Sequence, residues 1–195
     1  MKLNLPNKLT VIRFVLSPAI LVAMLIDFPF HYAVALLIFL IASVTDYYDG
    51  KIARDQHLIT DFGKFLDPIA DKMITTAAFL GLTVLNIGYG IVWITFIVLL
   101  REFIVASVRM IAASKGKVIA ANMWGKTKTV MQMVAIIATL SFLAVLDCSL
   151  LSLSDIAVFV IETVYSVLLW FSAVFTLISG ITYITANKDF INSNK

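Results

Sequence analysis

Long apolar runs separated by short polar segments dominate this chain. The runs lie at roughly residues 9–26, 31–50, 65–86, 88–112, 124–146 and 155–186. About 20 apolar residues are what a helix needs to cross the hydrocarbon core of a bilayer. The runs show no sustained alternation of apolar and polar positions, which argues against strands. The pattern therefore predicts an all-α integral membrane protein with six transmembrane helices.

Length and composition agree with a single membrane domain. The 195 residues are 61% hydrophobic, and the mean hydropathy is +0.99. The links between the runs are short, and no soluble domain, linker or internal repeat is visible. We therefore expect residues 1–195 to form one domain. The single Cys148 excludes an intramolecular disulfide.

The basic residues fix an expected orientation. The 15 Lys and Arg fall in four places: the N-terminus up to Arg13, the segment 51–72, the segment 101–128, and the C-terminus from Lys188. Because Lys and Arg accumulate on the cytoplasmic side of membrane proteins, both termini and both basic connections are predicted to be cytoplasmic. An even number of spans agrees with this orientation. The basic face suits anionic lipid headgroups or phosphorylated substrates, and no nucleic-acid partner is expected.

Four aspartates lie at the cytoplasmic edge of the second and third runs. If the second run stays helical to about residue 54, Asp46 and Asp49 share one face as an i,i+3 pair. Asp67 and Asp71 form an i,i+4 pair, whether Pro68 starts the third helix with Asp67 as its cap or kinks a longer helix. The short connection makes an antiparallel hairpin, so the two pairs can face each other.

Four carboxylates in apolar surroundings require compensating cations. Two of them about 4 Å apart repel by roughly 4 kcal/mol at an effective dielectric near 20, so four would hold protons unless divalent ions intervened. Oxygen ligands favour Mg²⁺ or Mn²⁺ over zinc, and four negative charges match two such ions. A pair of metals about 4 Å apart is a known device for displacement at phosphorus.

Small and basic residues accompany the aspartates. Gly50 and Ala53 leave a shallow slot beside the first pair, and Gly63 leaves a gap one turn before the second pair. Arg54 adds a guanidinium that can clamp a phosphate. Thr60 is predicted either to hydrogen-bond a bound nucleotide or to cap the third helix. Together these residues indicate a site for a phosphorylated substrate beside the metals.

The string Asp46-Tyr-Tyr-Asp49-Gly50-Lys-Ile-Ala53-Arg54, followed by Gly63-Lys-Phe-Leu-Asp67-Pro-Ile-Ala-Asp71, resembles the signature of the CDP-alcohol phosphotransferase family. Members of that family have six membrane helices with both ends cytoplasmic. They transfer a phosphatidyl or similar group from a CDP-linked donor to an alcohol and release CMP. Every signature position is filled in this chain.

The resemblance implies roles for individual residues. It implies that the four aspartates hold two divalent metals, Mg²⁺ or Mn²⁺, and that Asp71 is also the general base. It implies a homodimer in the plasma membrane with the active site facing the cytoplasm. The residues expected to bind the donor CDP-diacylglycerol are Asp46, Asp49, Gly50, Ala53, Arg54, Thr60, Gly63 and Asp67.

Three further stretches resemble the bacterial phosphatidylglycerophosphate synthases of that family. They are Asn4 to Arg13, Arg101 to Arg109, and Gly125 to Thr129, whereas residues 147–195 match only in being apolar. The implied acceptor is glycerol 3-phosphate, a dianion that a pocket of basic residues would bind well. The residues expected to bind its phosphate are Arg101, Arg109, Lys126 and Lys128. Inositol phosphate would suit the same residues, and serine would need less positive charge.

Two other classes of function remain as alternatives. Intramembrane acids also mark ion-coupled transporters, but those place their sites near the bilayer midplane, and Arg54 would repel a transported cation. A scaffold with a structural calcium ion leaves Gly50 and Ala53 unexplained. Glu102 is expected either to form a structural ion pair with Arg101 or to organise the acceptor site. The enzyme interpretation accounts for the largest number of these residues.

Overall fold

The protein is described from a computed structural model over residues 5–55, 61–117, 119, 123–147 and 154–188. For residues 5, 6, 47–55, 61–65, 67, 68 and 71 the backbone alone is described. All regular structure in the described part of the chain is helical. The helices are α1 (Leu5–Leu25), α2 (His31–Asp55), α3 (Asp61–Val84), α4 (Ile91–Ser114), α5 (Met123–Asp147) and α6 (Asp155–Ala186).

The helices follow the apolar runs of the sequence, and this confirms the all-α prediction. Four of them, α1, α4, α5 and α6, are long and apolar enough to cross a membrane. For α2 and α3, whose side chains are described only in part, the apolar stretches among the described side chains are His31–Asp46 and Lys72–Val84. The aspartate signature begins at Asp46 and ends at Asp71 in α3. Six membrane crossings therefore remain a prediction.

Helix ends coincide with local capping and turn residues. The Ser154 side chain caps α6 by accepting a hydrogen bond from the backbone N–H of Ala157 at 3.3 Å. Gly90 precedes α4 with a φ of 67°, a left-handed conformation that glycine adopts without steric cost. α6 is continuous over 32 residues, which makes it longer than one bilayer crossing requires.

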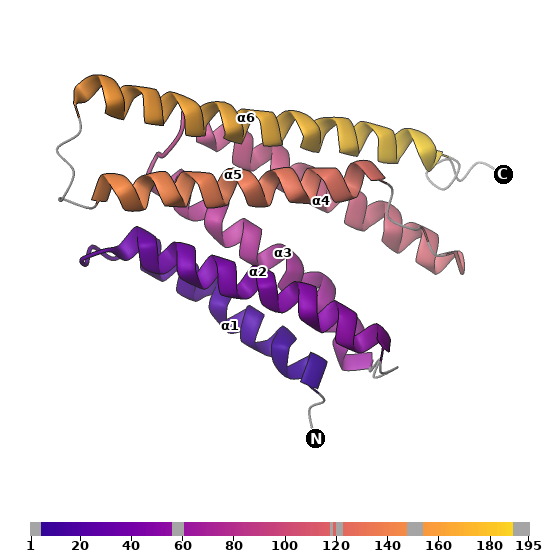
Figure 1. Cartoon of the computed structure of the whole chain (residues 1–195). Coiled ribbons are helices and arrows are strands. Elements are labelled where there is room, and N and C mark those ends of the chain that lie inside the picture. Colours follow the sequence, from indigo (N-terminus) through magenta and orange to yellow (C-terminus); the bar gives the residue numbers. More distant parts are fainter. Residues whose placement is uncertain (1–4, 56–60, 118, 120–122, 148–153, 189–195) are drawn as a thin grey trace.

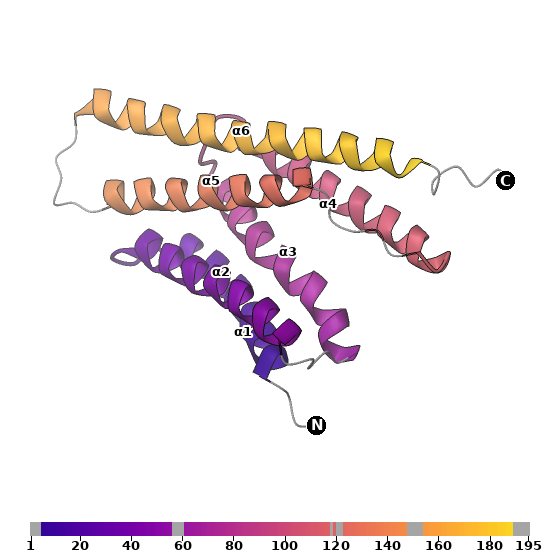
Figure 2. The same cartoon turned by 45° about the vertical axis from the view of Figure 1, so that its right-hand side comes forward.

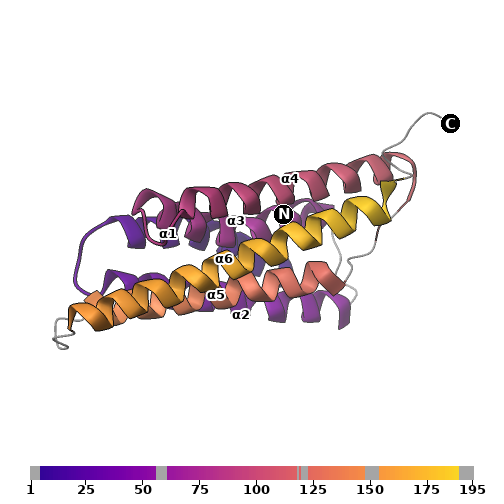
Figure 3. The same ribbon diagram turned by 90° about the horizontal axis from the view of Figure 1, so that it is seen from above.

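The six helices form two groups (Figures 1 and 2). In one group, α1 packs against both α2 and α3; in the other, α6 packs against α4 and α5. Contacts between α2 and α5 and between α3 and α4 join the groups. The view from above shows α6 running along α5, with α4 on the opposite side of α6 (Figure 3).

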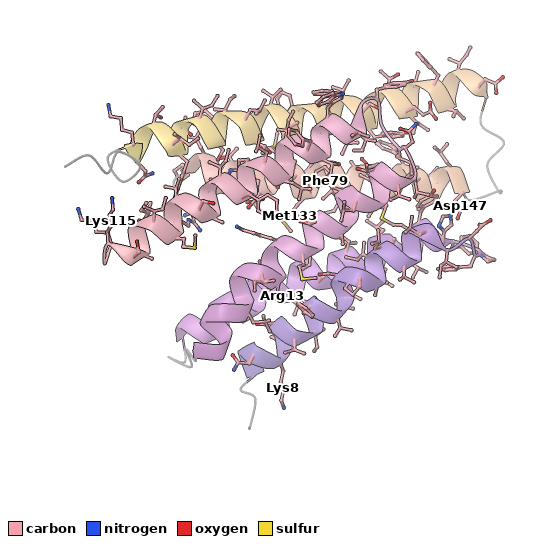
Figure 4. All side chains as sticks on the ribbon, turned by 180° about the vertical axis from the view of Figure 1, so that it is seen from behind. Lys8, Arg13, Phe79, Lys115, Met133 and Asp147 are labelled. Atoms are coloured by element: carbon pink, nitrogen blue, oxygen red, sulfur yellow. The ribbon has the colours of Figure 1, made fainter. Side chains whose placement is uncertain are left out.

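The helices begin and end at two opposite ends of the bundle. The starts of α1, α3 and α5 and the ends of α2, α4 and α6 share one end (Figures 1 and 2). Lys8 and Lys115 lie at this end, and Asp147 lies at the other (Figure 4). The helix ends next to the predicted basic segments therefore lie on one side of the molecule. We call this side the basic end.

The interior and the surface are those of a protein in lipid. Large apolar side chains on α4, such as Trp93, Phe96 and Phe103, are more than half exposed. Polar side chains are buried between the helices instead, including Gln132 and Thr139 on α5 and Thr176 on α6. Gln132 donates a hydrogen bond to the Thr176 hydroxyl at 3.0 Å. Helix contacts through polar side chains are typical of membrane bundles, because lipid provides no hydrophobic drive for helix association.

Candidate functional site

The backbone places the four signature aspartates on two helix ends. Because α2 continues to Asp55, Asp46 and Asp49 share one helical face as expected. Because α3 begins at Asp61, Asp67 and Asp71 lie within one continuous helix. The alternative in which Asp67 caps a helix that starts at Pro68 is wrong. Both helix ends lie at the basic end (Figure 1).

For most residues of the predicted donor and metal sites, the side chain is not described. Thr60 lies outside the described residues. Only the backbone is described for the signature residues Asp49, Gly50, Ala53, Arg54, Gly63, Asp67 and Asp71. Among the described residues, no group of three His, Cys, Asp or Glu could hold a metal ion. The two-metal arrangement therefore stays a prediction. The four donors present at this hairpin are carboxylates, a set that fits Mg²⁺ or Mn²⁺.

Asp46 is the signature aspartate whose side chain is described. It forms an ion pair with Arg13, which comes from α1 and is buried. A buried guanidinium needs a compensating charge, and the Asp46 carboxylate supplies one. Arg13 thus belongs to the site, although the sequence placed it only within a matching N-terminal stretch.

A cavity of about 750 Å³ opens beside Asp46. Side chains from α2, α3, α4, α5 and α6 line it, and Met133 on its wall lies between the two helix groups (Figure 4). The four residues predicted to bind the acceptor phosphate, Arg101, Arg109, Lys126 and Lys128, all line this cavity. Lys72, the residue after Asp71, adds a fifth cation. The structure therefore brings residues 56 positions apart, from Lys72 to Lys128, around one space.

Glu102 lies at the centre of these cations. Its carboxylate is 3.4 Å from the Lys72 ammonium and 3.2 Å from the Arg101 guanidinium. It also forms an ion pair with Lys128. The side chains of Arg101 and Lys128 are only 10% and 7% exposed, so a neighbouring carboxylate offsets part of the cost of burying them. Glu102 thus both pairs with Arg101 and joins α3, α4 and α5 at the cavity wall.

The two arginines of the cavity are also held by α6. The Arg101 guanidinium donates from Nη2 to the Ser179 hydroxyl at 2.7 Å. The Arg109 guanidinium donates from Nε to the Tyr183 hydroxyl at 3.2 Å. Ser179 and Tyr183 could not be singled out from the sequence, because both lie in a long apolar run without a recognised motif.

The charge and size of the cavity determine what it can bind. Its described lining contains five cationic side chains and two carboxylates, Asp46 and Glu102. The surplus of positive charge suits a small dianion such as a phosphate ester. Apolar residues such as Ile74, Val105 and Met133 make up other parts of the wall. The cavity adjoins Asp46, so an anion held there lies next to the predicted metal site.

Known proteins are similar to this chain over nearly its whole length. The family model for CDP-alcohol phosphatidyltransferase matches residues 3–178. The CDP-diacylglycerol–glycerol-3-phosphate 3-phosphatidyltransferase of Bacillus subtilis is 34% identical over 203 residues, covering 98% of each chain. The protein of the same name from Rickettsia bellii is 34% identical and covers 96% of this chain and 97% of its own. A probable phosphatidylglycerophosphate synthase of Mycobacterium tuberculosis is 42% identical over 136 residues, 68% of this chain and 64% of its own.

Proposed function

Because the chain belongs to the CDP-alcohol phosphatidyltransferase family, we propose that it transfers the phosphatidyl group of CDP-diacylglycerol to glycerol 3-phosphate. The products are phosphatidylglycerophosphate and CMP. The names of the relatives carry the choice of acceptor, and the basic cavity lined by Arg101, Arg109 and Lys128 supports an acceptor that bears a phosphate. Relatives named for this reaction match almost from end to end.

The orientation that fits this function places the basic end in the cytoplasm. All six helices cross the membrane, with the polar parts of α2 and α3 at the cytoplasmic face of the plasma membrane. The gathering of Lys8, Lys115 and the basic connections at one end supports this arrangement (Figure 4). CDP-diacylglycerol then enters from the inner leaflet with its acyl chains along the apolar helix surfaces. By resemblance to the family, the enzyme works as a homodimer.

The donor binds at the hairpin between α2 and α3. Asp46, Asp49, Asp67 and Asp71 would hold two ions of Mg²⁺ or Mn²⁺, which when bound neutralise charge on the phosphoryl oxygens. Gly50, Ala53 and Gly63 leave room for the CDP group, and Arg54 and Thr60 contact it. The Arg13–Asp46 ion pair links α1 to the Asp46 side of this site.

The reaction is a displacement at the lipid-side phosphorus. The Asp71 carboxylate accepts the proton of the primary hydroxyl of glycerol 3-phosphate. That oxygen forms a new bond to phosphorus while the bond from phosphorus to the CMP oxygen breaks. Arg101, Arg109, Lys126 and Lys128 hold the acceptor phosphate and so orient its hydroxyl toward the donor. Lys72 follows Asp71 on α3 and contributes positive charge between the two subsites.

The assay of choice follows CMP release from purified protein. Protein, CDP-diacylglycerol and Mg²⁺ are incubated with glycerol 3-phosphate, inositol phosphate or serine in separate reactions, and the lipid product is identified by mass spectrometry. The proposal expects CMP and phosphatidylglycerophosphate with glycerol 3-phosphate, and loss of both when EDTA removes the metal. CMP release with inositol phosphate or serine alone would refute the acceptor assignment. Absence of CMP with every alcohol would favour the ion-coupled transporter instead.

A further inference from the structure

One face of α6 carries two hydroxyl groups that meet the arginines of the cavity. Ser179 and Tyr183 are four residues apart, so they lie one helical turn from each other on the same face. Both side chains are buried, with exposed fractions of 0% and 2%. Their partners, Arg101 and Arg109, are eight residues apart on α4 and therefore also share a face. The two contacts align α6 with the arginine-bearing face of α4.

The contact at Tyr183 fixes both the position and the plane of the Arg109 guanidinium. The phenol oxygen accepts from Nε at 3.2 Å, and the guanidinium carbon lies 5.7 Å from the ring centroid. A cation at this distance from an aromatic face is attracted to it. Tyr183 itself packs against Val105 and Val108, so the ring is immobilised. Because Nε faces Tyr183, the two terminal amino groups of Arg109 are the donors left for a phosphate in the cavity.

Gly180, the residue after Ser179, also lies against the Arg101 side chain. A methyl group at Gly180 would lie 3.1 Å from Cγ of Arg101, closer than an ordinary van der Waals contact. The missing side chain at Gly180 therefore lets the Arg101 stem rest against α6 while its Nη2 reaches Ser179. Both arginines are thus oriented by the same short segment of α6, from Ser179 to Tyr183.

We propose that Ser179 and Tyr183 are positioning residues that set the affinity for the acceptor phosphate. A free arginine loses much rotamer freedom when it binds an anion, and this loss weakens binding. Contacts that orient the guanidinium in advance reduce the loss. The inference rests on the proposed function and deepens it, because it assigns to α6 a part in acceptor recognition. Removing either hydroxyl weakens acceptor binding and leaves donor binding and the chemical step unaltered.

The decisive variant is Tyr183→Phe, which removes the hydroxyl and keeps the ring under Arg109. We expect KM for glycerol 3-phosphate to rise about threefold to tenfold, since a hydrogen bond to a charged group is lost. We expect kcat and KM for CDP-diacylglycerol to stay within about twofold of the unmodified enzyme. The matched control is Tyr165→Phe, in the same helix and equally buried, which lines a separate pocket with Asn86 and Glu162. The control should leave all three constants unchanged.

A second variant tests the other arginine. Ser179→Ala should raise the same KM by a similar factor, because Arg101 loses its Nη2 partner. The two arginines hold the same phosphate, so the double variant should raise this KM more than either single variant does. Equal changes in both KM values and in kcat for Tyr183→Phe would mean a general structural role and would overturn the inference.

Direct binding separates this inference from the proposed reaction. The dissociation constant of inorganic phosphate is measured from the shift of the thermal unfolding midpoint, with metal and lipid absent. If the unmodified protein releases CMP but Tyr183→Phe matches Tyr165→Phe in acceptor KM and phosphate binding, the inference fails and the function stands. If no alcohol releases CMP but Tyr183→Phe alone weakens phosphate binding, the function fails and the role of α6 in anion binding stands.

Discussion

Among the residues that the structure describes, the buried side chains of Arg13, Arg101 and Lys128 each meet an opposite charge. Arg13 pairs with Asp46, and Glu102 forms ion pairs with Lys72, Arg101 and Lys128. A buried pair is costly to break, because the remaining charge has no compensation. The charges of the four signature aspartates are predicted to be compensated in the same way, by bound metal ions. Their spacing could be interpreted from the sequence because helical periodicity alone decides which positions share a face.

The proposed base can be removed with a change of a single atom. Asp71→Asn keeps the size of the side chain but cannot accept the proton of the acceptor hydroxyl, and it weakens one metal ligand. We expect a folded protein whose kcat is lower by at least about 10³-fold, measured as CMP release. The matched control is Asp61→Asn at the start of the same helix, which should retain full activity. Substantial turnover by Asp71→Asn would remove this residue from the chemical step.

Lys126 is predicted to bind the acceptor phosphate in the cavity. Lys126 lines the cavity, whereas Lys115 is exposed beyond the end of α4 and does not contribute to the lining. Lys126→Ala should raise KM for glycerol 3-phosphate by about tenfold, because one charge-assisted contact to the phosphate is lost. KM for CDP-diacylglycerol should change by less than about twofold. An equal effect of Lys115→Ala would show that general surface charge attracts the substrate.

The helices themselves followed from the apolar runs, because backbone groups in lipid have no partner other than their own helix. The run at 155–186 coincides with α6, and α2 extends beyond its apolar run to Asp55, as the pairing of Asp46 with Asp49 required. The contacts of α6 with the cavity could not be inferred. Ser179 and Tyr183 acquire their meaning only when α6 packs against α4, and no local pattern encodes that packing.

Close packing of α1 on α3 depends on Gly81. An added Cβ at this position would lie 2.6 Å from the sulfur of Met24 on α1. Gly81→Leu should therefore displace the buried Met24 side chain and overpack the contact, and lower the thermal unfolding midpoint by about 4–8 °C for a cost of about 2 kcal/mol. Val84→Leu, on an exposed face of the same helix, is the control and should shift the midpoint by no more than about 1 °C. A stable Gly81→Leu protein would contradict the tight α1–α3 contact.

At the scale of the whole molecule, opposite ends of the bundle should face opposite sides of the membrane. Single cysteines introduced by Lys115→Cys and Asp155→Cys in a Cys148→Ser background mark the two ends. A membrane-impermeant maleimide should label position 155 in right-side-out vesicles and position 115 in inverted vesicles, as the positive-inside rule requires. Labelling of both positions from one side would contradict the six-span arrangement.

The proposed reaction depends on one shared site, in which the carboxylates of α2 and α3 would bind two metal ions beside the basic cavity. The most direct test is an anomalous difference map from crystals grown with Mn²⁺ and glycerol 3-phosphate. We predict two manganese peaks about 4 Å apart between Asp46, Asp49, Asp67 and Asp71, with the acceptor phosphate between Arg101, Arg109 and Lys128. Manganese absent from these carboxylates, or a phosphate bound outside the cavity, would contradict the account.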